Sequence, residues 1–240
     1  MIPPNVAGSV VAGYRIEEVA GRGSMGVVYR ATQLVLQRPV ALKLIATESA
    51  HDARFRERFQ RESQLAASFD HPNVIPIYEA GEVDGSLFLA MRFVEGTDLG
   101  ALIRAEGTLE PAHAVRIVAQ AAAGLSAAHA LGLVHRDVKP ANVLIAAGED
   151  EHVYLADFGL TKHASSAAGL TQPGMFVGTL DYSAPEVIRG DPADARADVY
   201  ALGCVLFHCL TGRPPFARDS EVATMYAHLH DAAPAPSTVA

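Results

Sequence analysis

The stretch His135-Arg136-Asp137-Val138-Lys139-Pro140-Ala141-Asn142 decides the fold of this 240-residue chain. It fits the pattern H-R-D-x-x-x-x-N, in which each polar residue has a chemical use. Asp137 can accept a proton from a substrate hydroxyl, Lys139 can neutralise charge on a phosphoryl group in transfer, and Asn142 can offer an amide oxygen to Mg²⁺. The alternative is a polar loop packed against a helix end, and the neighbouring motifs argue against it.

Further motifs follow this stretch in the sequence. Asp157-Phe158-Gly159 comes just after a strand predicted at 153–155 and places a second Mg²⁺ carboxylate on a glycine-hinged turn. Gly178-Thr179 and Ser183-Ala184-Pro185-Glu186 stand farther along. Any one of these motifs could arise by chance, so their joint order carries the argument for phosphoryl-transfer chemistry.

A glycine-rich segment, Gly21-Arg22-Gly23-Ser24-Met25-Gly26-Val27-Val28, precedes them near the N-terminus. It fits G-x-G-x-x-G-x-V, but a dinucleotide site would need a helix to follow, and Val27-Val28-Tyr29 is strand-like. What remains is a glycine-rich turn between two strands. Without Cβ atoms, its backbone N–H groups can approach phosphate oxygens closely. An ordinary glycine-rich hairpin is the alternative.

Lys43 lies within the apolar run 40–45, where an unpaired ammonium group would be costly to bury. We expect it to pair with an acid on a helix at 52–69 and with nucleotide phosphates. Glu62 is the preferred acid because it borders the apolar face of that helix. Glu57 is the second choice, since it sits among arginines and could form a solvated pair with Arg61. An edge-strand lysine reaching water is the alternative for Lys43.

The first part of the chain has the pattern of a sheet with one helix. Short β-branched runs broken by glycine predict a strand meander over 10–50, with further strands at 74–80 and 87–94 around an Asp84-Gly85 hairpin turn. Between them, large apolar side chains at helical spacing predict one amphipathic helix, and these are Phe55, Phe59, Leu65 and Phe69.

Helices dominate after Glu95-Gly96. A long helix is predicted over 110–131, with Pro111 near its start and Gly132 just past its end. The segment 199–210 is apolar all round and should be a buried helix. Short strands are predicted at 143–145 and 153–155, a helix at 221–230, and a linker-like tail at 232–240.

Charge and composition exclude other classes of protein. The net charge is 19 − 27 = −8, whereas a nonspecific nucleic-acid binder needs the opposite sign. Cys204 and Cys209 flank an apolar run, which predicts buried thiols in a reducing compartment, here the cytoplasm. We also expect a soluble chain, because no signal peptide or apolar run of membrane-spanning length is present.

These motifs together resemble the protein kinase family. The match runs from about Tyr14 to about Phe216. It is most similar to the bacterial Ser/Thr kinases of eukaryotic type, on the residues from Gly23 to Ala31 and on His71-Pro72-Asn73-Val74. The resemblance implies an α+β bilobal fold forming one catalytic domain over 1–240, with a β-rich lobe at 10–94 and a mainly helical lobe at 95–231. Residues 94–96 would be the hinge between them.

The resemblance also implies where ATP would bind. Met91 would stand at the back of the adenine pocket, Arg92 and Val94 would offer backbone hydrogen bonds to adenine, and Asp98 would contact the ribose. The residues that would sandwich the adenine ring, for which ordinary core packing is an equally good explanation, are Val28, Ala41 and Leu144. Residues 21–26 and Lys43 would hold the phosphates, and Mg²⁺, with Mn²⁺ as the alternative, would be held by Asn142 and Asp157.

The implied reaction is transfer of the ATP γ-phosphoryl to Ser or Thr hydroxyls of proteins. Thr179 would contact Asp137 and Lys139, His135 would stack on Phe158, and Asp198 would hydrogen-bond the backbone of the catalytic loop. Arg136 would respond to phosphorylation of the segment 157–186, with Thr171 as the expected autophosphorylation site. An ordinary solvated loop threonine is the alternative for Thr171. Trans-autophosphorylation would use a kinase–kinase dimer.

Two rival functions are weaker. A pseudokinase scaffold would need a damaged Lys, Asp or Gly motif, and the sequence shows none. A pure interaction module would leave the metal-ligand residues without a use. The resemblance further predicts that the last helices of the helical lobe are absent. Glu186 would then lack its usual arginine partner, because Arg218 is the last arginine and lies too early. Glu186 would therefore pair differently or stay solvated.

Overall fold

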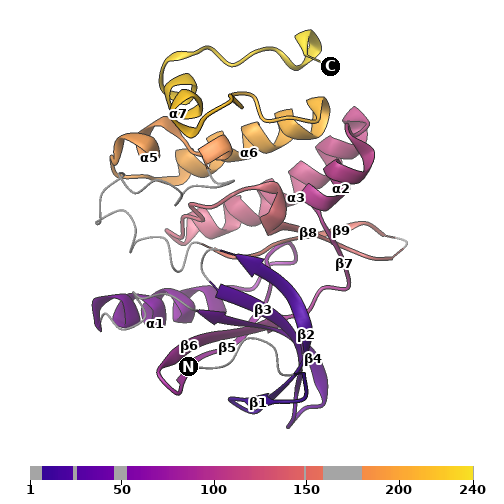
Figure 1. Ribbon diagram of the computed structural model, residues 1–240, viewed down its shortest axis with the longest axis vertical. Coiled ribbons are helices and arrows are strands. Elements are labelled where there is room, and N and C mark those ends of the chain that lie inside the picture. Colours follow the sequence, from indigo (N-terminus) through magenta and orange to yellow (C-terminus); the bar gives the residue numbers. More distant parts are fainter. Residues whose placement is uncertain (1–6, 24–25, 46–52, 149, 159–179, 240) are drawn as a thin grey trace. The chain divides into compact units, whose positions relative to one another are not determined.

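The computed structural model describes residues 7–23, 26–45, 53–148, 150–158 and 180–239 (Figure 1). Contacts between residues divide the chain into two compact units. Of the described residues, the first unit holds those up to Asp70 together with Ile75–Val94. The second holds His71–Val74 and the residues from Glu95 onward.

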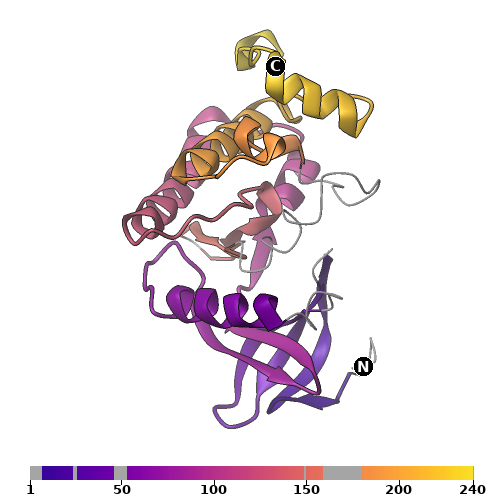
Figure 2. The ribbon, with the colours of Figure 1, turned by 90° about the vertical axis from the view of Figure 1, so that its left-hand side faces the viewer.

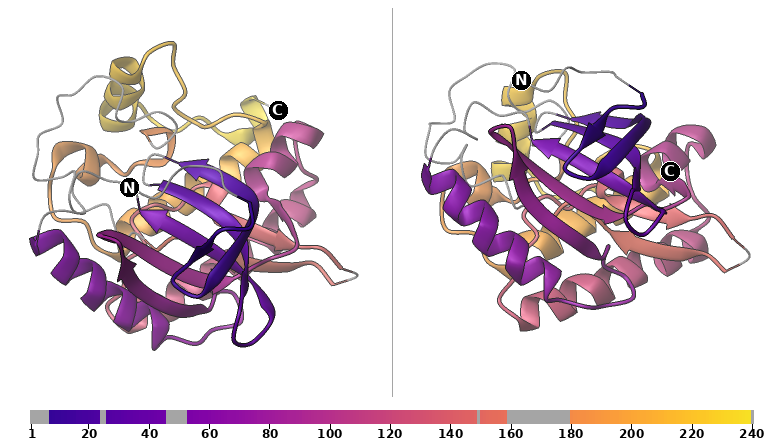
Figure 3. Two further views of the ribbon diagram at one scale, coloured as in Figure 1. Left: turned by 60° about the horizontal axis from the view of Figure 1, so that its bottom comes forward. Right: turned by 90° about the horizontal axis from the view of Figure 1, so that it is seen from below.

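The first unit is an antiparallel sheet with one helix. Its strands lie in the order β1-β2-β3-β4-β6-β5, and α1 packs against β5 (Figures 2 and 3). The hairpin at Asp84-Gly85 has the positive φ angles, 49° and 76°, that a tight two-residue connection requires. The elements of this unit are β1 (Val10–Val11), β2 (Tyr14–Gly23), β3 (Gly26–Gln33), β4 (Arg38–Ile45), α1 (Ala53–Ala67), β5 (Ile77–Val83) and β6 (Ser86–Arg92).

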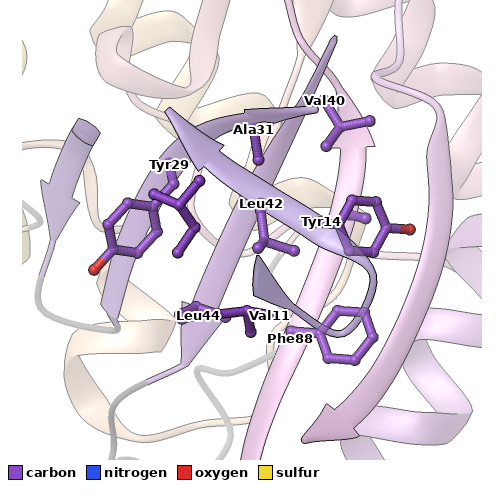
Figure 4. Packing of buried hydrophobic residues seen from close by; sticks show 10 residues of the cluster. Val11, Tyr14, Tyr29, Ala31, Val40, Leu42, Leu44 and Phe88 are labelled. Carbon is purple, nitrogen blue, oxygen red and sulfur yellow. The ribbon is translucent and has the colours of Figure 1, made fainter. Parts of the chain in front are cut away.

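Alternate residues of the sheet build an apolar cluster on one face (Figure 4). Leu42 on β4 pairs with Tyr29 on β3 and with Ala90 on β6, and all three are buried. Because side chains alternate between the two faces of a strand, the intervening residues lie on the opposite face. The cluster contains Val11, Tyr14, Ile16, Tyr29, Ala31, Val40, Leu42, Leu44, Phe88 and Ala90.

The predicted helix forms, but its buried face differs from the expectation at one position. Phe55 and Phe59 are 3% and 1% exposed, whereas Leu65 is 48% exposed. Leu65 lies ten residues after Phe55, which turns it away from the packed face. Ser63 and Ala66 occupy that face instead, and the helix ends before Phe69.

The predicted strand at 74–80 begins late. Pro76 lacks the N–H that a ladder needs, and β5 starts at Ile77. Val74 instead forms an isolated parallel bridge with Leu155 of the second unit, and the Leu155 N–H donates to the Asn73 carbonyl at 2.9 Å. Residues 71–74 therefore belong by their contacts to the second unit.

The second unit combines a small sheet, ordered β7-β8-β9, with helices. The long helix α3 packs on α6 and on β9. Glu110 caps α3 by accepting from the His113 N–H, and Gly132 follows its end with φ 75°. The elements are β7 (Gly96–Asp98), α2 (Leu99–Glu106), α3 (Pro111–Ala130), η2 (Pro140–Asn142), β8 (Val143–Ala146), β9 (His152–Leu155), η3 (Leu180–Tyr182), α5 (Pro185–Arg189), α6 (Ala195–Thr211), α7 (Glu221–His230) and η4 (Pro236–Thr238).

The helix α6 is longer and less deeply buried than its apolar sequence predicts. It runs over Ala195–Thr211, and Val199 is 63% exposed because only one side of the helix is covered. Cys204 and Cys209 are both buried free thiols, as predicted. The helix predicted at 221–230 is confirmed as α7, and η4 lies against α6. Within the described residues, no helix is both long and apolar enough to span a membrane.

Candidate active site

Three polar residues of the H-R-D-x-x-x-x-N stretch meet in the second unit. Lys139 Nζ donates to Asp137 Oδ2 at 2.8 Å. Asn142 Nδ2 donates to the Asp137 carbonyl at 2.7 Å and to Asp137 Oδ2 at 3.2 Å. The side chains of Asp137 and Lys139 are 10% and 25% exposed, so a substrate group could still reach both.

These bonds also orient the predicted metal ligands. Because Nδ2 of Asn142 is the donor end, its Oδ1 is the end that can serve as a metal ligand. The Ala156 N–H donates to the Asn142 carbonyl at 2.9 Å, which ties Asn142 to the residue preceding Asp157. One amide oxygen and one carboxylate suit Mg²⁺, which takes few protein ligands and keeps water and phosphate oxygens. The described residues contain no group of three His, Cys, Asp or Glu side chains that could hold a metal by themselves.

The backbone on both sides of this cluster is strained. Arg136 has φ 61° and Asp157 has φ 59°, although neither is glycine. A left-handed conformation costs an ordinary residue roughly 1–2 kcal/mol and persists only where surrounding contacts enforce it. These two residues are Asp157 itself and the immediate neighbour of Asp137, so the strain sits where the predicted chemistry needs fixed carboxylates.

His135 supplies one of the enforcing contacts. Its Nδ1 accepts the Asp137 N–H at 3.2 Å, so its Nε2 carries the proton and donates to the Ala156 carbonyl at 3.0 Å. Burial lowers the pKa of this imidazole, which keeps it neutral near neutral pH. Its ring centroid lies 4.5 Å from that of Phe158, so the two rings are in contact as predicted, but at 39° they are tilted rather than stacked.

Asp198 supplies the other enforcing contacts, as predicted. The carboxylate is 1% exposed and lies in the first turn of α6. It accepts the His135 N–H on Oδ2 and the Arg136 N–H on Oδ1, both at 2.7 Å. A third donor, Nε2 of His129 on α3, reaches Oδ2 at 2.7 Å. The sequence analysis did not single out His129, because nothing in the surrounding sequence marks it as a partner of Asp198.

The first unit brings several of the predicted ATP-binding residues onto one face of its sheet. Val28 pairs directly with Lys43, and Ala41 pairs with Met91. These residues alternate with the apolar cluster and so point to the opposite face. The backbone N–H of Arg92 donates to the Pro76 carbonyl at 3.0 Å. The predicted backbone hydrogen bond between Arg92 and adenine would therefore use the carbonyl oxygen of Arg92.

The glycine-rich segment lies at the end of one strand and the beginning of the next, as predicted. Gly21, Arg22 and Gly23 end β2, and Gly26 begins β3 opposite Gly23. No helix follows Gly26, and this removes the dinucleotide interpretation.

Burial distinguishes Glu62, the predicted acid partner of Lys43, from the alternative, Glu57. Glu62 is half-buried and lies seven residues after Phe55, on the packed face of α1, whereas Glu57 is exposed. The burial favours Glu62, and its pairing with Lys43 stays a prediction.

In the second unit, the predicted ribose and adenine residues are neighbours. Asp98 on β7 pairs in register with Leu144 on β8. Asp98 Oδ1 accepts the Ala101 N–H at 2.9 Å and caps α2, so this carboxylate has a structural use in addition to the predicted one.

Comparison with known proteins agrees with these observations. A family model described as the protein kinase domain matches residues 14–238. The chain belongs to the protein kinase domain family.

Named relatives of this kinase domain come from mycobacteria. It is 49% identical to the serine/threonine-protein kinase PknD of Mycobacterium tuberculosis over 96% of its own length and 34% of that protein. It is 48% identical to the serine/threonine-protein kinase PknE of the same species, over 94% of its own length and 39% of that protein. The chain thus spans little more than a third of the length of these relatives.

Solved structures show the same fold. The crystal structure of the Mycobacterium tuberculosis PknI kinase domain matches with a TM-score of 0.74 and 32% identity, covering 98% of this chain and 93% of that one. A C20A mutant of that domain matches with a TM-score of 0.76. The α+β kinase fold expected from the sequence is therefore confirmed.

Several predicted residues of the kinase domain lie outside the described residues. These are Ser24, Met25, Gly159, Thr171, Gly178 and Thr179, and their roles stay predictions. Glu186 is described and is half-buried on α5. Its charge contributes to raising the pKa of the Arg196 guanidinium, after the larger effect of the hydrogen bond from Arg196 to Asp194. Partial exposure fits the expectation that Glu186 stays solvated.

Proposed function

We propose that this kinase domain transfers the γ-phosphoryl group of ATP to Ser or Thr hydroxyls of proteins. The single observation that carries the proposal is the Asp137–Lys139–Asn142 cluster, with Lys139 Nζ 2.8 Å from Asp137 Oδ2. The relatives named serine/threonine-protein kinases support the choice of acceptor. Lys139-Pro140-Ala141-Asn142 also resembles the Ser/Thr branch of the family.

Asp137 acts on the acceptor hydroxyl in this mechanism. Its carboxylate orients the hydroxyl and takes its proton while the acceptor oxygen forms a bond to the γ-phosphorus and the bond from that phosphorus to the ADP oxygen breaks. Lys139, already beside Asp137 Oδ2, neutralises charge on the transferring group. The Asn142 amide holds Asp137 in place through its Nδ2 donor.

Asn142 Oδ1 and the Asp157 carboxylate would hold Mg²⁺, which neutralises phosphate charge when bound. In the first unit, residues 21–26 and Lys43, paired with Glu62, would anchor the phosphates of ATP. Val28, Ala41, Met91, Arg92 and Val94, with Asp98 and Leu144 of the second unit, would contact the adenosine.

Regulation and location are part of the proposal. Phosphate adds roughly −1.5 to −2 charges at neutral pH, and a phosphorylated Thr171 would be attracted to Arg136. Autophosphorylation in a kinase–kinase dimer would supply that phosphate, and Thr179 would contribute to the Ser/Thr preference. The buried thiols of Cys204 and Cys209 support a reducing, cytoplasmic setting for this domain.

Incubation with Mg·ATP followed by intact-mass and peptide analysis tests the proposal. We expect the wild-type chain to gain phosphate on residues 165–179 and to phosphorylate a Ser/Thr peptide, and Asp137→Asn to do neither while still binding Mg·ATP. Asp191→Asn changes an exposed aspartate elsewhere and should behave as wild type. Turnover by Asp137→Asn at the wild-type rate would refute the assignment. A wild-type chain that binds Mg·ATP without transferring phosphate would instead support the pseudokinase.

A further inference from the structure

Arg30 has no role in the proposed reaction, yet its side chain lies on the face of the sheet that carries predicted adenine residues. On β3 it pairs in register with Ala41 of β4, and Ala41 pairs in register with Met91 of β6. Residues directly opposite one another on neighbouring strands point to the same face. Arg30 therefore shares a face with Ala41 and Met91, and its side chain is 37% exposed there.

Two carboxylates of β2 hold the Arg30 guanidinium. The register between β2 and β3 shifts between Ile16 and Glu18, and this β-bulge places the extra residue, Glu17, beside Glu18 opposite Arg30. The Arg30 Nε lies 3.2 Å from Glu17 Oε2, and its Nη1 lies 3.7 Å from Glu18 Oε1. Glu17 is itself held by the hydroxyl of Thr32, which donates to its Oε1. Two negative charges on one strand therefore fix the guanidinium in place.

The same guanidinium also lies over an aromatic ring. Arg30 Cζ is 5.1 Å from the centroid of the Phe93 ring, which is within the roughly 6 Å at which a cation is attracted to the face of an aromatic ring. Phe93 is half-buried and comes directly after β6. Arg30 therefore links the chain that leaves β6 to the two carboxylates of β2.

Phe93 stands between the two backbone groups that are predicted to hold adenine. The Arg92 carbonyl belongs to the peptide group before the Phe93 Cα, and the Val94 N–H belongs to the peptide group after it. Because each peptide group is planar, the φ and ψ angles of Phe93 set how these two groups are oriented relative to each other. Adenine carries an amino donor as well as ring-nitrogen acceptors, whereas guanine has an acceptor where adenine has the amino group. A carbonyl and an N–H in a fixed arrangement can therefore select adenine.

We propose that Arg30 is a positioning residue that anchors the ring of Phe93. The anchored ring fixes the φ and ψ angles of Phe93, and so keeps the Arg92 carbonyl and the Val94 N–H in the arrangement that selects adenine. The inference rests on the proposed function, because it concerns recognition of the base of ATP. The contact between Arg30 and Phe93 stands without that function and can be measured in the absence of nucleotide.

Two substitutions test the positive charge of Arg30. Arg30→Met keeps a long unbranched side chain and removes the cation, whereas Arg30→Lys keeps a cation on a long stem. We expect Arg30→Met to weaken the binding of Mg·ATP by roughly twofold to fivefold in calorimetric titrations, and to weaken that of Mg·GTP less, so that the preference for ATP falls. Arg30→Lys should restore most of both losses. In peptide phosphorylation, the loss should appear in KM for ATP rather than in kcat.

Phe93→Leu tests whether Arg30 acts through the ring. It removes the ring but keeps an apolar side chain, and it should weaken the binding of Mg·ATP to a similar degree. In the Phe93→Leu background, Arg30→Met should have no further effect on affinity, because the contact is already absent. Full additivity of the two losses would show that Arg30 acts on the nucleotide by another route, and would overturn the proposal.

Arg38 provides a matched control in the same sheet. Its Cζ lies 3.6 Å from the centroid of the Tyr78 ring, so Arg38→Met removes a contact of the same kind. Tyr78 packs against the apolar cluster, which is on the face opposite to Arg30. We expect Arg38→Met to affect stability and to leave both the affinity for Mg·ATP and the preference over Mg·GTP at wild-type values. An equal loss of affinity in Arg38→Met and Arg30→Met would mean that stability explains both, against the proposal.

A readout independent of nucleotide is available because the chain contains no tryptophan. Phe93→Trp introduces a single fluorescent ring at the proposed anchor, and an indole is attracted to a cation at least as strongly as a phenyl ring is. In this background and without nucleotide, we expect Arg30→Met to lower the fluorescence anisotropy, since the ring gains freedom, whereas Arg38→Met should leave it unchanged. If Phe93→Trp does not fold, hydrogen exchange of the Val94 amide in Arg30→Met and Arg38→Met replaces the fluorescence comparison.

The outcomes separate the inference from the proposed function. A wild-type chain that does not bind Mg·ATP would overturn the proposed function, and the anisotropy comparison would still decide whether Arg30 anchors the side chain at position 93. Wild-type affinity and base preference in Arg30→Met, in a chain that binds Mg·ATP, would overturn the inference and leave the kinase assignment intact. Unchanged anisotropy in Arg30→Met would overturn the inference as well, because the ring would then not depend on the guanidinium.

Discussion

The apolar cluster of the first unit and the buried surroundings of Asp198 in the second unit hold the backbone by different means. The cluster is built from alternate side chains of paired strands, and Leu42 at its centre is fully buried between Tyr29 and Ala90. Its stabilisation comes from apolar burial, which has no direction and tolerates changes of similar volume.

The surroundings of Asp198 have the opposite character. One carboxylate receives three donors at 2.7 Å and holds a left-handed Arg136. Hydrogen bonds are directional, and a buried donor that loses its partner costs more free energy than the bond contributes. The comparison teaches that the apolar cluster contributes stability alone, whereas the hydrogen bonds to Asp198 contribute stability and also fix the position of Asp137.

Asp198→Ala should give the largest effect. It tests whether the hydrogen bonds to this carboxylate hold the backbone that positions Asp137. It removes the acceptor of three N–H donors at a carboxylate that is 1% exposed, so we expect a loss of about 3–5 kcal/mol in the free energy of unfolding. We also expect peptide phosphorylation to be lost at temperatures where the variant is still folded, because Arg136 can relax. Thermal unfolding and turnover of the same sample measure both effects. Retained turnover in the folded variant would show that the carboxylate does not position Asp137.

Leu42→Ala tests the apolar cluster. It should lower the free energy of unfolding, as Asp198→Ala does, but it should not displace Asp137. A fully buried leucine truncated to alanine costs about 3 kcal/mol, since a cavity remains. We expect the melting temperature to fall while kcat, measured well below it, stays near the wild-type value. Leu42→Met keeps the volume and should cost less than about 1.5 kcal/mol. A collapse of kcat in folded Leu42→Ala would erase the distinction between the two regions.

The sequence predicts best what short stretches of chain determine. Asp137, Lys139 and Asn142 lie within six residues, so the motif itself brings them together, and the structure joins them directly. The resemblance to kinases placed both Ala41 and Met91 at the adenine pocket, and the two residues pair directly across β4 and β6. The resemblance to kinases added Asp198, which lies more than sixty residues from the turn that it holds.

The failures of prediction all involve contacts between distant parts of the chain. Leu65 looked like a core residue of α1, but helix packing covers Ser63 and Ala66 instead. Val74 was predicted to begin the strand at 74–80, but it forms an isolated bridge with Leu155 instead. His129 has no local pattern that marks it as a donor to a carboxylate on another helix, because helix packing alone brings the two together.

The smallest expected effect concerns pH. Acid should destabilise the second unit more than the first, which sharpens the comparison between the two units. The described part of the first unit contains no histidine, whereas burial in the second unit lowers the pKa of His135 and His208 and lowers that of His228 to about 4. His228 is 4% exposed, and its Nδ1 accepts the Tyr200 hydroxyl at 2.7 Å.

The sign of the effect follows from where the proton binds first. As the pH falls from about 6.5 to about 4, the unfolded chain binds a proton at His228 before the folded chain does, so the free energy of unfolding falls. Above about pH 6.5 the group is neutral in both states and its contribution to stability is complete. We expect His228 to account for up to about 3 kcal/mol of the loss over that range.

Hydrogen exchange measured across pH for each unit checks this prediction. His228→Gln, which keeps an acceptor for Tyr200, should flatten the pH slope of the second unit, whereas His230→Gln changes an exposed histidine on the same helix and should leave it. An unchanged slope in His228→Gln would mean that other groups carry the acid sensitivity.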